Sequence, residues 1–503
     1  LPALARCFPH HDPISHPLPD CAEPPDYSRL TNEERKKREI NEEDMQKVVS
    51  KLPRLAGLDQ FGHCYELYQN LVRSGKTDGL FSFLNYVMKE DLDDSIKQDF
   101  AGASLFALEK EGDVPNGTVE ERKLRSICAG TILRRIVSRL FCFKERHEFN
   151  DFFVPSKTQI DESRAKGENL PIQTAVACQG GAELAAHLIR THLQMNPSHC
   201  DLKTDVTEAF QRIHRKAFLE EVNSNFPQMS RYLFNVYDPR FPGKLWHRKP
   251  NGDWVSLDCE EGCQQGDPLG LFLFSIGIHP SLQKLARLFP DCLIVAYADD
   301  VHILGVPDRA RLAFIQLKVE FARIGLTINN NKCEVYCPNG ANSLKHLFTE
   351  EMWATKSSVS AFANDPRCDL VERTGIIVLG TPVGDDLFVK ELLEEKQESL
   401  RLKIDNLIEI FVTKRDFCTT DHQAYYQLLR TTVLPSLTYL CRTVPPRLFD
   451  ERFCQDTNLL IKKAMNKCVG HQLLISGLPF SQTLIHLPLN LGGFGLPTIE
   501  STL

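Results

Sequence analysis

The sequence predicts a mixed α/β (α+β) fold in which a sheet-bearing middle is flanked by helical segments. Strand-like and helical stretches alternate from about residue 200 to 385, as in a βαβ-type sheet with helices on one face. From Lys390 onward, long helical stretches such as 391–411 and 423–434 follow. A chain of 503 residues with 42% hydrophobic content can bury more than one core, so we expect about two to four subdomains.

The first 110 residues predict two segments that differ in composition. Residues 1–51 are rich in proline and charge and predict a mobile arm. Leucine, phenylalanine and tyrosine then recur at three- and four-residue spacing, which predicts a helical segment over 52–110. Because Leu1 stands where a methionine would begin a chain, we expect a fragment or a processed protein, from which activities encoded upstream are missing.

Two adjacent carboxylates, Asp299 and Asp300, follow Tyr297 and Ala298 between the β-prone runs 292–296 and 301–304. This pattern predicts a hairpin with the acidic pair at its tip. Adjacent like charges repel, so the pair makes sense chiefly if a divalent cation neutralises it. A lone acidic pair is more often an ordinary acidic turn. The metal hypothesis therefore depends on a further carboxylate elsewhere in the chain.

Asp205 supplies that further carboxylate. A short strand-like run ends at this residue, and apolar residues at helical spacing follow it, so Asp205 lies at a predicted strand-to-helix junction. If the fold brings it beside Asp299, the two positions would hold two cations about 3.5–4 Å apart, as two-metal phosphoryl transfer requires. Oxygen ligands favour Mg²⁺, with Mn²⁺ as a second possibility.

A glycine-rich loop, 262–270, lies between these acidic positions and runs into the apolar stretch 271–276. Glycines let a backbone approach a flat ligand closely. The following helix offers its amino-terminal end to an anion or packs under a base pair.

In this order, the three stretches resemble a reverse transcriptase, most closely the kind encoded by retrotransposons without long terminal repeats. The segments 202–215, 262–274 and 297–300 look like the family's first palm motif, its QGDPLG motif and its YADD motif. Weaker similarities follow the family's order at 123–135, 179–183, 325–334, 375–380 and 487–495. The resemblance spans about residues 100–500. It implies a right-hand polymerase with fingers (111–199) above the 52–110 segment, a palm (200–385) and a helical thumb with the C-terminal segment (386–503).

The resemblance also implies roles for single residues. Asp205, Asp299 and Asp300 would hold the metals. Phe210 would lie beneath the incoming sugar, where its ring leaves no room for a 2′-hydroxyl, so deoxynucleotides are the expected substrate. Taken alone, Phe210 would more simply be a core aromatic residue.

Contacts to the rest of the substrate are implied in the same way. Gln265 and Gly266 would back the nascent base pair, with Gln264 beside them. Lys332 would donate a proton to pyrophosphate, although an isolated lysine is more often a solvated surface residue. Arg125 and Lys110 would grip the triphosphate. Ser126, Gln211 and Leu271 depart from the family pattern, but none of these departures removes a metal ligand.

The charge balance is unusual for a protein that must hold a phosphate backbone. The net charge is −7 and the pI is near 6.2. The stretch 121–146 carries eight basic residues against two acidic ones. It predicts either a cationic patch for phosphate contacts or an ordinary solvated helix face. We expect weak intrinsic affinity for nucleic acid.

Cysteine usage predicts an intracellular, reducing compartment, either nucleus or cytoplasm, because 17 cysteines are scattered and no secretory leader is visible. Their spacing matches no zinc-binding arrangement, and Cys263 and Cys333 are better explained as small buried side chains. No apolar run approaches the roughly 18–20 residues of a membrane span.

The leading hypothesis is a magnesium-dependent polymerase that makes DNA from dNTPs on an RNA template, extending a DNA or RNA primer. An element-encoded RNA in a ribonucleoprotein is a possible partner. A decayed or repurposed relative that only binds nucleic acid or a protein is the first alternative, and an RNA-synthesising polymerase is the second. No ribonuclease H or endonuclease pattern follows the last recognisable run, which ends near Leu496.

Overall fold

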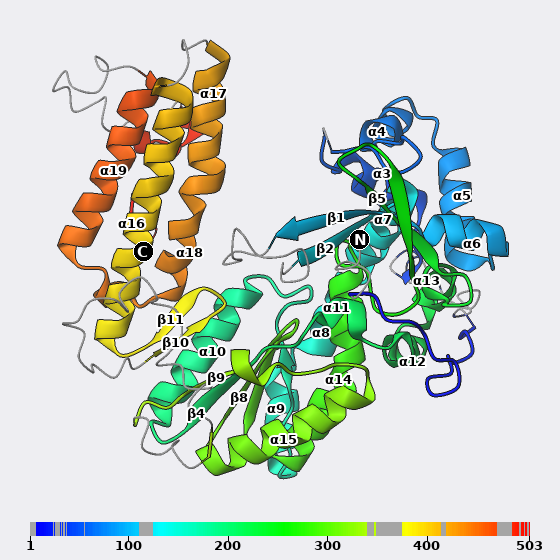
Figure 1. The fold of residues 1–503 in the computed structure, drawn as a ribbon, viewed down its shortest axis with the longest axis horizontal. Coiled ribbons are helices and arrows are strands. Elements are labelled where there is room, and N and C mark those ends of the chain that lie inside the picture. The colour runs from blue at the N-terminus through cyan, green and yellow to red at the C-terminus, as the bar shows by residue number, and fades with distance from the viewer. Residues whose placement is uncertain are drawn as a thin grey trace. The chain divides into compact units, whose positions relative to one another are not determined.

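The computed structural model of the chain describes residues 7–23, 25, 31, 33, 36, 38–54, 56–109, 124–339, 347–348, 375–413, 419–469, 485–491, 494–496, 498–499 and 502. They form two compact units: Leu1–Gly181 with Leu202–Cys333, and Ala182–Asp201 with Glu334–Leu503. Helices and sheets occur together (Figure 1), so the predicted mixed α/β class is confirmed. The bounds of the predicted subdomains stay predictions.

One sheet of the first unit has the strand order β2-β1-β5-β6. Its strands are β1 (Ala103–Glu109), β2 (Leu124–Gly130), β5 (Gly243–Arg248) and β6 (Trp254–Cys259). β1 runs antiparallel to β2 and parallel to β5, and β5 runs antiparallel to β6. The stretch 103–109 belongs to the segment that we expected to be helical, and this part of the prediction is wrong. Leu105 is buried there while Phe106 is exposed, which is the alternation of a strand.

A second sheet carries the candidate site. Within the first unit its strands run in the order β3-β7-β8-β4, with β3 parallel and β8 antiparallel to β7. The strands are β3 (Ile172–Gln173), β4 (Cys200–Thr204), β7 (Leu293–Tyr297) and β8 (Asp300–Gly305). Two long helices, α14 (Gly270–Leu288) and α15 (Pro307–Arg323), pack against β7 and β8 respectively (Figure 1). Val295 and Ile303 are fully buried, so this hairpin is held firmly at its base.

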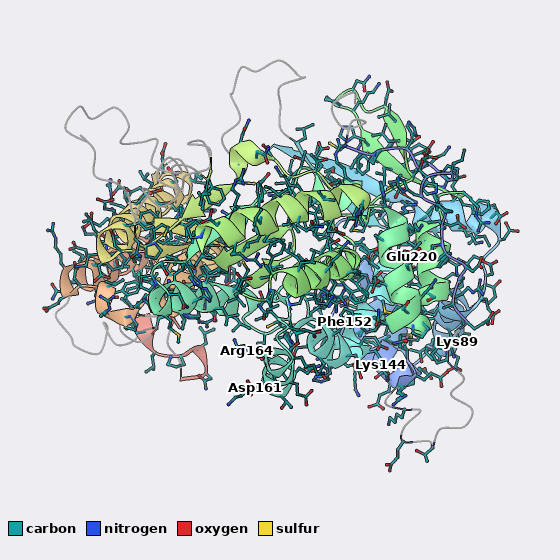
Figure 2. The ribbon with its side chains drawn as sticks, turned by 90° about the horizontal axis from the view of Figure 1, so that it is seen from below. Lys89, Lys144, Phe152, Asp161, Arg164 and Glu220 are labelled. Carbon is teal, nitrogen blue, oxygen red and sulfur yellow. The ribbon has the colours of Figure 1, made fainter. Side chains whose placement is uncertain are left out.

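Shorter helices complete the first unit. They are α3 (Glu42–Ser50), α4 (Tyr65–Arg73), α5 (Asp78–Lys89), α6 (Asp94–Ala101), α7 (Ile132–Lys144), α8 (Arg146–Phe153), α9 (Lys157–Ala165), α11 (Ala209–Arg212), α12 (Arg215–Asn225), α13 (Ser230–Tyr237) and the single turns Pro227–Met229 and Asn330–Lys332. α4, α5 and α6 lie in the segment predicted to be helical, whereas the described residues between Leu52 and Cys64 form no helix. On α9, the exposed side chains of Asp161 and Arg164 point away from the ribbon (Figure 2).

Part of the predicted N-terminal arm, residues 7–23, lies against the first unit. Phe8 is buried in a cluster that includes Leu105 and Leu245. Farther along, the ring of His16 lies 3.7 Å from the ring of His214. The mobility of the arm stays a prediction. The contacts of Phe8 and His16 are the points at which the arm would be anchored.

The second unit contains a β-hairpin and a group of long helices. The hairpin pairs β10 (Gly375–Val378) with β11 (Thr381–Gly384) in antiparallel register. The other elements are α10 (Gly181–Met195), β9 (Glu334–Tyr336), α16 (Asp386–Ile408), α17 (Thr419–Leu428), α18 (Pro435–Thr443), α19 (Glu451–Val469) and short turns at Glu409–Thr413, Leu429–Val433, Pro446–Leu448 and Leu489–Leu491. α16 to α19 share one core, which includes Leu400, Tyr425, Leu437 and Ile461. Across all described residues, every helix is too short or too polar to traverse a lipid bilayer.

Candidate active site

The acidic hairpin has the form that the sequence predicted. Tyr297, the last residue of β7, pairs with Asp300, the first residue of β8, so Ala298 and Asp299 form the two-residue tip. Ala298 has a φ of 55°, a left-handed conformation that costs energy for any residue with a Cβ atom. The tip is therefore a strained turn that presents a carboxylate.

The carboxylates at this tip are held in an unfavourable environment. Burial, with the charges of Asp300 and Asp205, raises the pKa of Asp299 to about 6, and the charge of Arg125 opposes the rise. Burial also raises the pKa of Asp300. Each carboxylate thus lacks a partner strong enough to offset its burial and the repulsion from its neighbours. A divalent cation relieves both costs, so the donor set fits Mg²⁺ or Mn²⁺.

Asp205 directly follows β4, as expected for a strand-to-helix junction. The hydroxyl of Thr204 donates to the carbonyl oxygen of Val301 at 3.1 Å, which fixes the end of β4 beside β8. The backbone N–H of Asn329 donates to the carbonyl oxygen of Asp205 at 2.8 Å. The helix that we expected from Val206 onward is shorter than predicted. It begins only at Ala209, because Val206 forms a β-bridge with Ile328 instead. It is then divided into α11 and α12, because the backbone of Ile213 and His214 is extended.

Lys332 lies beside this carboxylate. Its Nζ is 3.6 Å from Oδ1 of Asp205, and both side chains are partly exposed. The structure therefore places the predicted proton donor next to a predicted metal ligand, where a lysine has a reason to lie other than solvation. Among the residues that the structure describes, no three His, Cys, Asp or Glu side chains are already arranged as a metal site. The charges of Asp205 and Asp300 act on Asp299, but the three carboxylates do not form a complete set of metal ligands.

The glycine-rich loop lies between strand β2 and the segment that follows Asp205. Its Cys263 N–H donates to the carbonyl oxygen of Phe210 at 2.8 Å, and its Gln265 carbonyl oxygen accepts from the Cys128 N–H at 2.7 Å. Gly266 has a φ of 118°, and a Cβ atom there would come within 2.5 Å of the Cys128 carbonyl oxygen. Close backbone approach explains this glycine. Cys263 and Cys333 are buried, as we expected.

A buried arginine anchors the loop from below, and the sequence analysis missed it. Nη2 of Arg134 lies 2.5 Å from Oδ2 of Asp267, and its Nη1 donates to Oε1 of Gln264 at 2.8 Å. The guanidinium also lies over the ring of Tyr237, with Cζ 5.3 Å from its centroid. A second buried arginine, Arg215, lies at the same distance from that ring. The only sequence signal was Asp267, a charged residue just before an apolar helix. A carboxylate buried at such a position needs a cationic partner.

This burial corrects the predicted cationic patch over 121–146. Arg134 is inside the protein, Arg135 lies over the ring of Tyr65, and Lys144 (labelled in Figure 2) pairs with Asp44 at 2.7 Å. Arg146 also donates to the carbonyl oxygen of Phe143 at 2.9 Å. Four of the eight basic residues are therefore engaged by the protein itself, and Arg122 and Lys123 lie outside the described residues. Charge counting overlooked this because it treats every arginine and lysine as solvated.

Phe210 lies on α11 and stacks on Phe274 of α14. Their ring centroids are 4.8 Å apart and the planes are inclined by 23°. Phe274 is fully buried, whereas Phe210 is only partly covered. The ring of Phe210 thus packs on the core through one neighbour and keeps some exposed surface.

Of the two predicted triphosphate contacts, the structure describes Arg125. Arg125 is exposed on β2, opposite Leu108, and its charge lowers the pKa of Asp299. Lys110 lies outside the described residues.

A further residue that the sequence analysis did not single out is Gln173, at the end of β3. Its side-chain amide is fully buried and bonds both backbone groups of Ala298, at 2.9 Å and 3.4 Å. The sequence offered no signal for it, because the partner is 125 residues away.

Residues 122–382 match the model of a family described as "Reverse transcriptase (RNA-dependent DNA polymerase)". The matched region is more than half of the chain and includes every site residue discussed above except Lys110. The chain belongs to the reverse transcriptase family, and the resemblance found in its motifs is confirmed.

A curated relative is the "Retrotransposable element SLACS 132 kDa protein" of Trypanosoma brucei gambiense. It is 30% identical over 139 residues, which cover 26% of this chain and 11% of that protein. The chain thus matches about a tenth of the relative's length.

Two of the solved structures with partial similarity are telomerases. That of Candida albicans, in complex with a fragment of telomeric RNA, has a TM-score of 0.39 and 10% identity, covering 84% of this chain and 70% of that chain. Apo telomerase of Candida tropicalis has a TM-score of 0.32 and 11% identity, covering 76% and 69%. Scores this low carry no detail of the site.

Proposed function

We propose that this protein is an RNA-directed DNA polymerase that adds dNTPs to a primer by two-metal phosphoryl transfer. The observation that carries the proposal is the proximity of Asp205 to Asp299, since the Thr204 hydroxyl, just before Asp205, donates to the carbonyl oxygen of Val301, just after Asp300. The two aspartates are 94 positions apart in the sequence, yet the charge of Asp205 contributes to the raised pKa of Asp299, and Lys332 lies beside Asp205.

Each site residue takes a role that its position allows. The carboxylates of Asp205, Asp299 and Asp300 bind two divalent cations, which supply Lewis-acid activation of the primer hydroxyl and charge neutralisation at the phosphates. Lys332 gives a proton to the departing pyrophosphate.

The nucleotide is held by other parts of the site. Arg125 pairs with the triphosphate, and Gln265 and Gly266 support the new base pair. Phe210 excludes the 2′-hydroxyl. Lys110 is proposed as a second phosphate contact on the family resemblance alone.

The partners follow from the same reaction. They are an RNA template, a DNA or RNA primer and dNTPs, and the similarity to a retrotransposable element's protein supports an element-encoded RNA held in a ribonucleoprotein. We place the reaction inside the cell, in the nucleus or cytoplasm.

The alternative is a decayed relative that binds nucleic acid without extending a primer. The engagement of Arg134, Arg135 and Lys144 inside the protein, together with the net charge of −7, favours weak binding of nucleic acid and keeps this alternative open to test.

Primer extension on an RNA template with Mg²⁺ and dNTPs tests the proposal. Asp205→Asn and Asp299→Asn should each lower incorporation at least about 100-fold, more than the loss usual for partners outside the ligand set. Asp291→Asn is the matched control, because this exposed aspartate pairs with Arg309 away from the tip. A parent protein that extends no primer contradicts the proposal, as do Asp205→Asn and Asp299→Asn variants that extend like the parent.

A further inference from the structure

The tip of the catalytic hairpin has an unusual backbone. Ala298, with its φ of 55°, is one of four non-glycine residues of positive φ among the described residues. Side chains disfavour this conformation because Cβ crowds the following carbonyl oxygen. Such strain persists only where the surroundings hold it in place, and it gathers at functional sites. Something in the fold must therefore hold Ala298 in this conformation.

Gln173 makes the contacts that do so. Its Oε1 accepts from the Ala298 N–H at 2.9 Å, and its Nε2 donates to the Ala298 carbonyl oxygen at 3.4 Å. One side-chain amide thus bonds both peptide groups of the strained residue. The side chain has no exposed surface, so water does not replace these bonds.

The fold holds this amide in register with the tip. β3 runs parallel to β7, and Gln173 lies opposite Ala296, two residues before Ala298. The N–H of Thr174 donates to the carbonyl oxygen of Ala296 at 2.9 Å, and Oε1 of Gln173 also accepts from the Ala175 N–H at 3.2 Å. Backbone pairing on both sides of the glutamine fixes its position.

We propose that Gln173 is a positioning residue, which locks the left-handed turn at Ala298 so that the Asp299 carboxylate faces Asp205. This inference rests on the proposed function. Without the two hydrogen bonds, repulsion among the three carboxylates and the strain at Ala298 both favour a rearranged turn that carries Asp299 away from the cation.

Binding of Mn²⁺ to the whole 503-residue chain, measured by electron paramagnetic resonance, tests the inference without turnover. Gln173→Met keeps the length of the side chain but removes both hydrogen bonds to Ala298, together with the one that Oε1 accepts from the Ala175 N–H. We expect its Mn²⁺ affinity to fall about 10- to 100-fold, the range for residues that orient a ligand. Gln69→Met is the matched control, since Gln69 is also buried and bonds a backbone carbonyl oxygen, that of Leu52, in the N-terminal helices.

Two substitutions of Ala298 separate positioning from general packing. Glycine adopts positive φ without the Cβ penalty, so Ala298→Gly should restore most of the affinity lost in Gln173→Met. Ala298→Val should reproduce the loss with Gln173 intact, because a β-branched residue resists this conformation. A general packing defect does not predict the rescue by Ala298→Gly, which therefore is the decisive result.

The outcomes distinguish this inference from the proposed function. If the parent binds Mn²⁺ and extends primers, yet Gln173→Met binds Mn²⁺ as the parent does or Ala298→Gly restores nothing, the positioning role is wrong and the proposed function stands. If the parent neither binds Mn²⁺ nor extends primers, the proposed function fails, and the inference fails with it.

Discussion

The ammonium group of Lys332 lies 3.6 Å from the carboxylate of Asp205, so the expected proton donor and an expected metal ligand form an ion pair when no cation is bound. Both side chains are partly exposed, and a pair of this kind is weak in water. A cation can therefore displace the lysine at little cost, which leaves its ammonium beside the reacting phosphates.

Replacement of Lys332 should affect two measurements in opposite directions. Lys332→Met removes a competitor for Asp205, so Mn²⁺ should bind at least as tightly as in the parent. The rate of nucleotide addition should fall about 100-fold or more, since general acid catalysis contributes about 10²–10⁴-fold. Lys318→Met, on α15 where the lysine lies over Phe314, serves as the control. Weaker Mn²⁺ binding with an unchanged rate would contradict the role of Lys332.

The raised pKa of Asp299 predicts a pH-dependent stability in the absence of metal. A carboxyl group that titrates at about 6 in the folded state, against about 3.9 in the unfolded chain, stabilises the folded protein most below its unfolded pKa. That contribution is lost as pH rises through about 6. Asp299→Asn should therefore raise the melting temperature in EDTA more at pH 8 than at pH 5. An equal effect at both pH values would count against the strained carboxylate.

The buried ion pair beneath the glycine-rich loop should be costly to break. Arg134→Met leaves the Asp267 carboxylate buried without its cation, which should reduce the free energy of unfolding by about 3–5 kcal/mol. Arg139→Met, on the exposed face of the same helix, should change it by no more than about 0.5 kcal/mol. Urea denaturation measures both variants. Similar midpoints for the two variants would mean that the pair does not anchor the loop.

The Phe210–Phe274 stack predicts an effect on sugar selection. Phe274→Leu removes the ring that supports Phe210, so the preference for dNTP over rNTP should fall about 3- to 10-fold, the differential that one aromatic pair supplies. Phe272→Leu removes a buried ring of the same helix that stacks on Phe149 instead. Single-nucleotide kinetics with both substrates give the ratio of kcat/KM values. The same ratio in both variants would show that Phe274 does not act on the sugar.

Local patterns in the sequence were sufficient to predict the parts of the site that local structure forms. Apolar, β-prone runs on both sides of the acidic pair predict that it lies at a hairpin tip, and the glycines of the loop follow from close backbone approach. The junction at Asp205 was also predictable, although the helix after it is interrupted. Each of these features depends on neighbours within a few residues.

Features that depend on distant partners could not be predicted. Arg134 and Asp267 are 133 residues apart, and Gln173 and Ala298 are 125 apart. No local sequence pattern identifies either pair. A buried arginine or glutamine cannot be distinguished in a sequence from one exposed to solvent. Strand β1 was taken for helix for a related reason, since its pairing with β2 and β5 is a tertiary contact that outweighs local preference.

Mn²⁺ binding in a double-substitution cycle tests most directly whether Asp205 and Asp299 hold the same cations. The four proteins are the parent, Asp205→Asn, Asp299→Asn and the double variant, each titrated with Mn²⁺ under electron paramagnetic resonance. Shared ligation predicts that either single substitution removes most of the binding and that the double variant loses little more. Losses that add independently, or single variants that bind Mn²⁺ like the parent, would contradict the account.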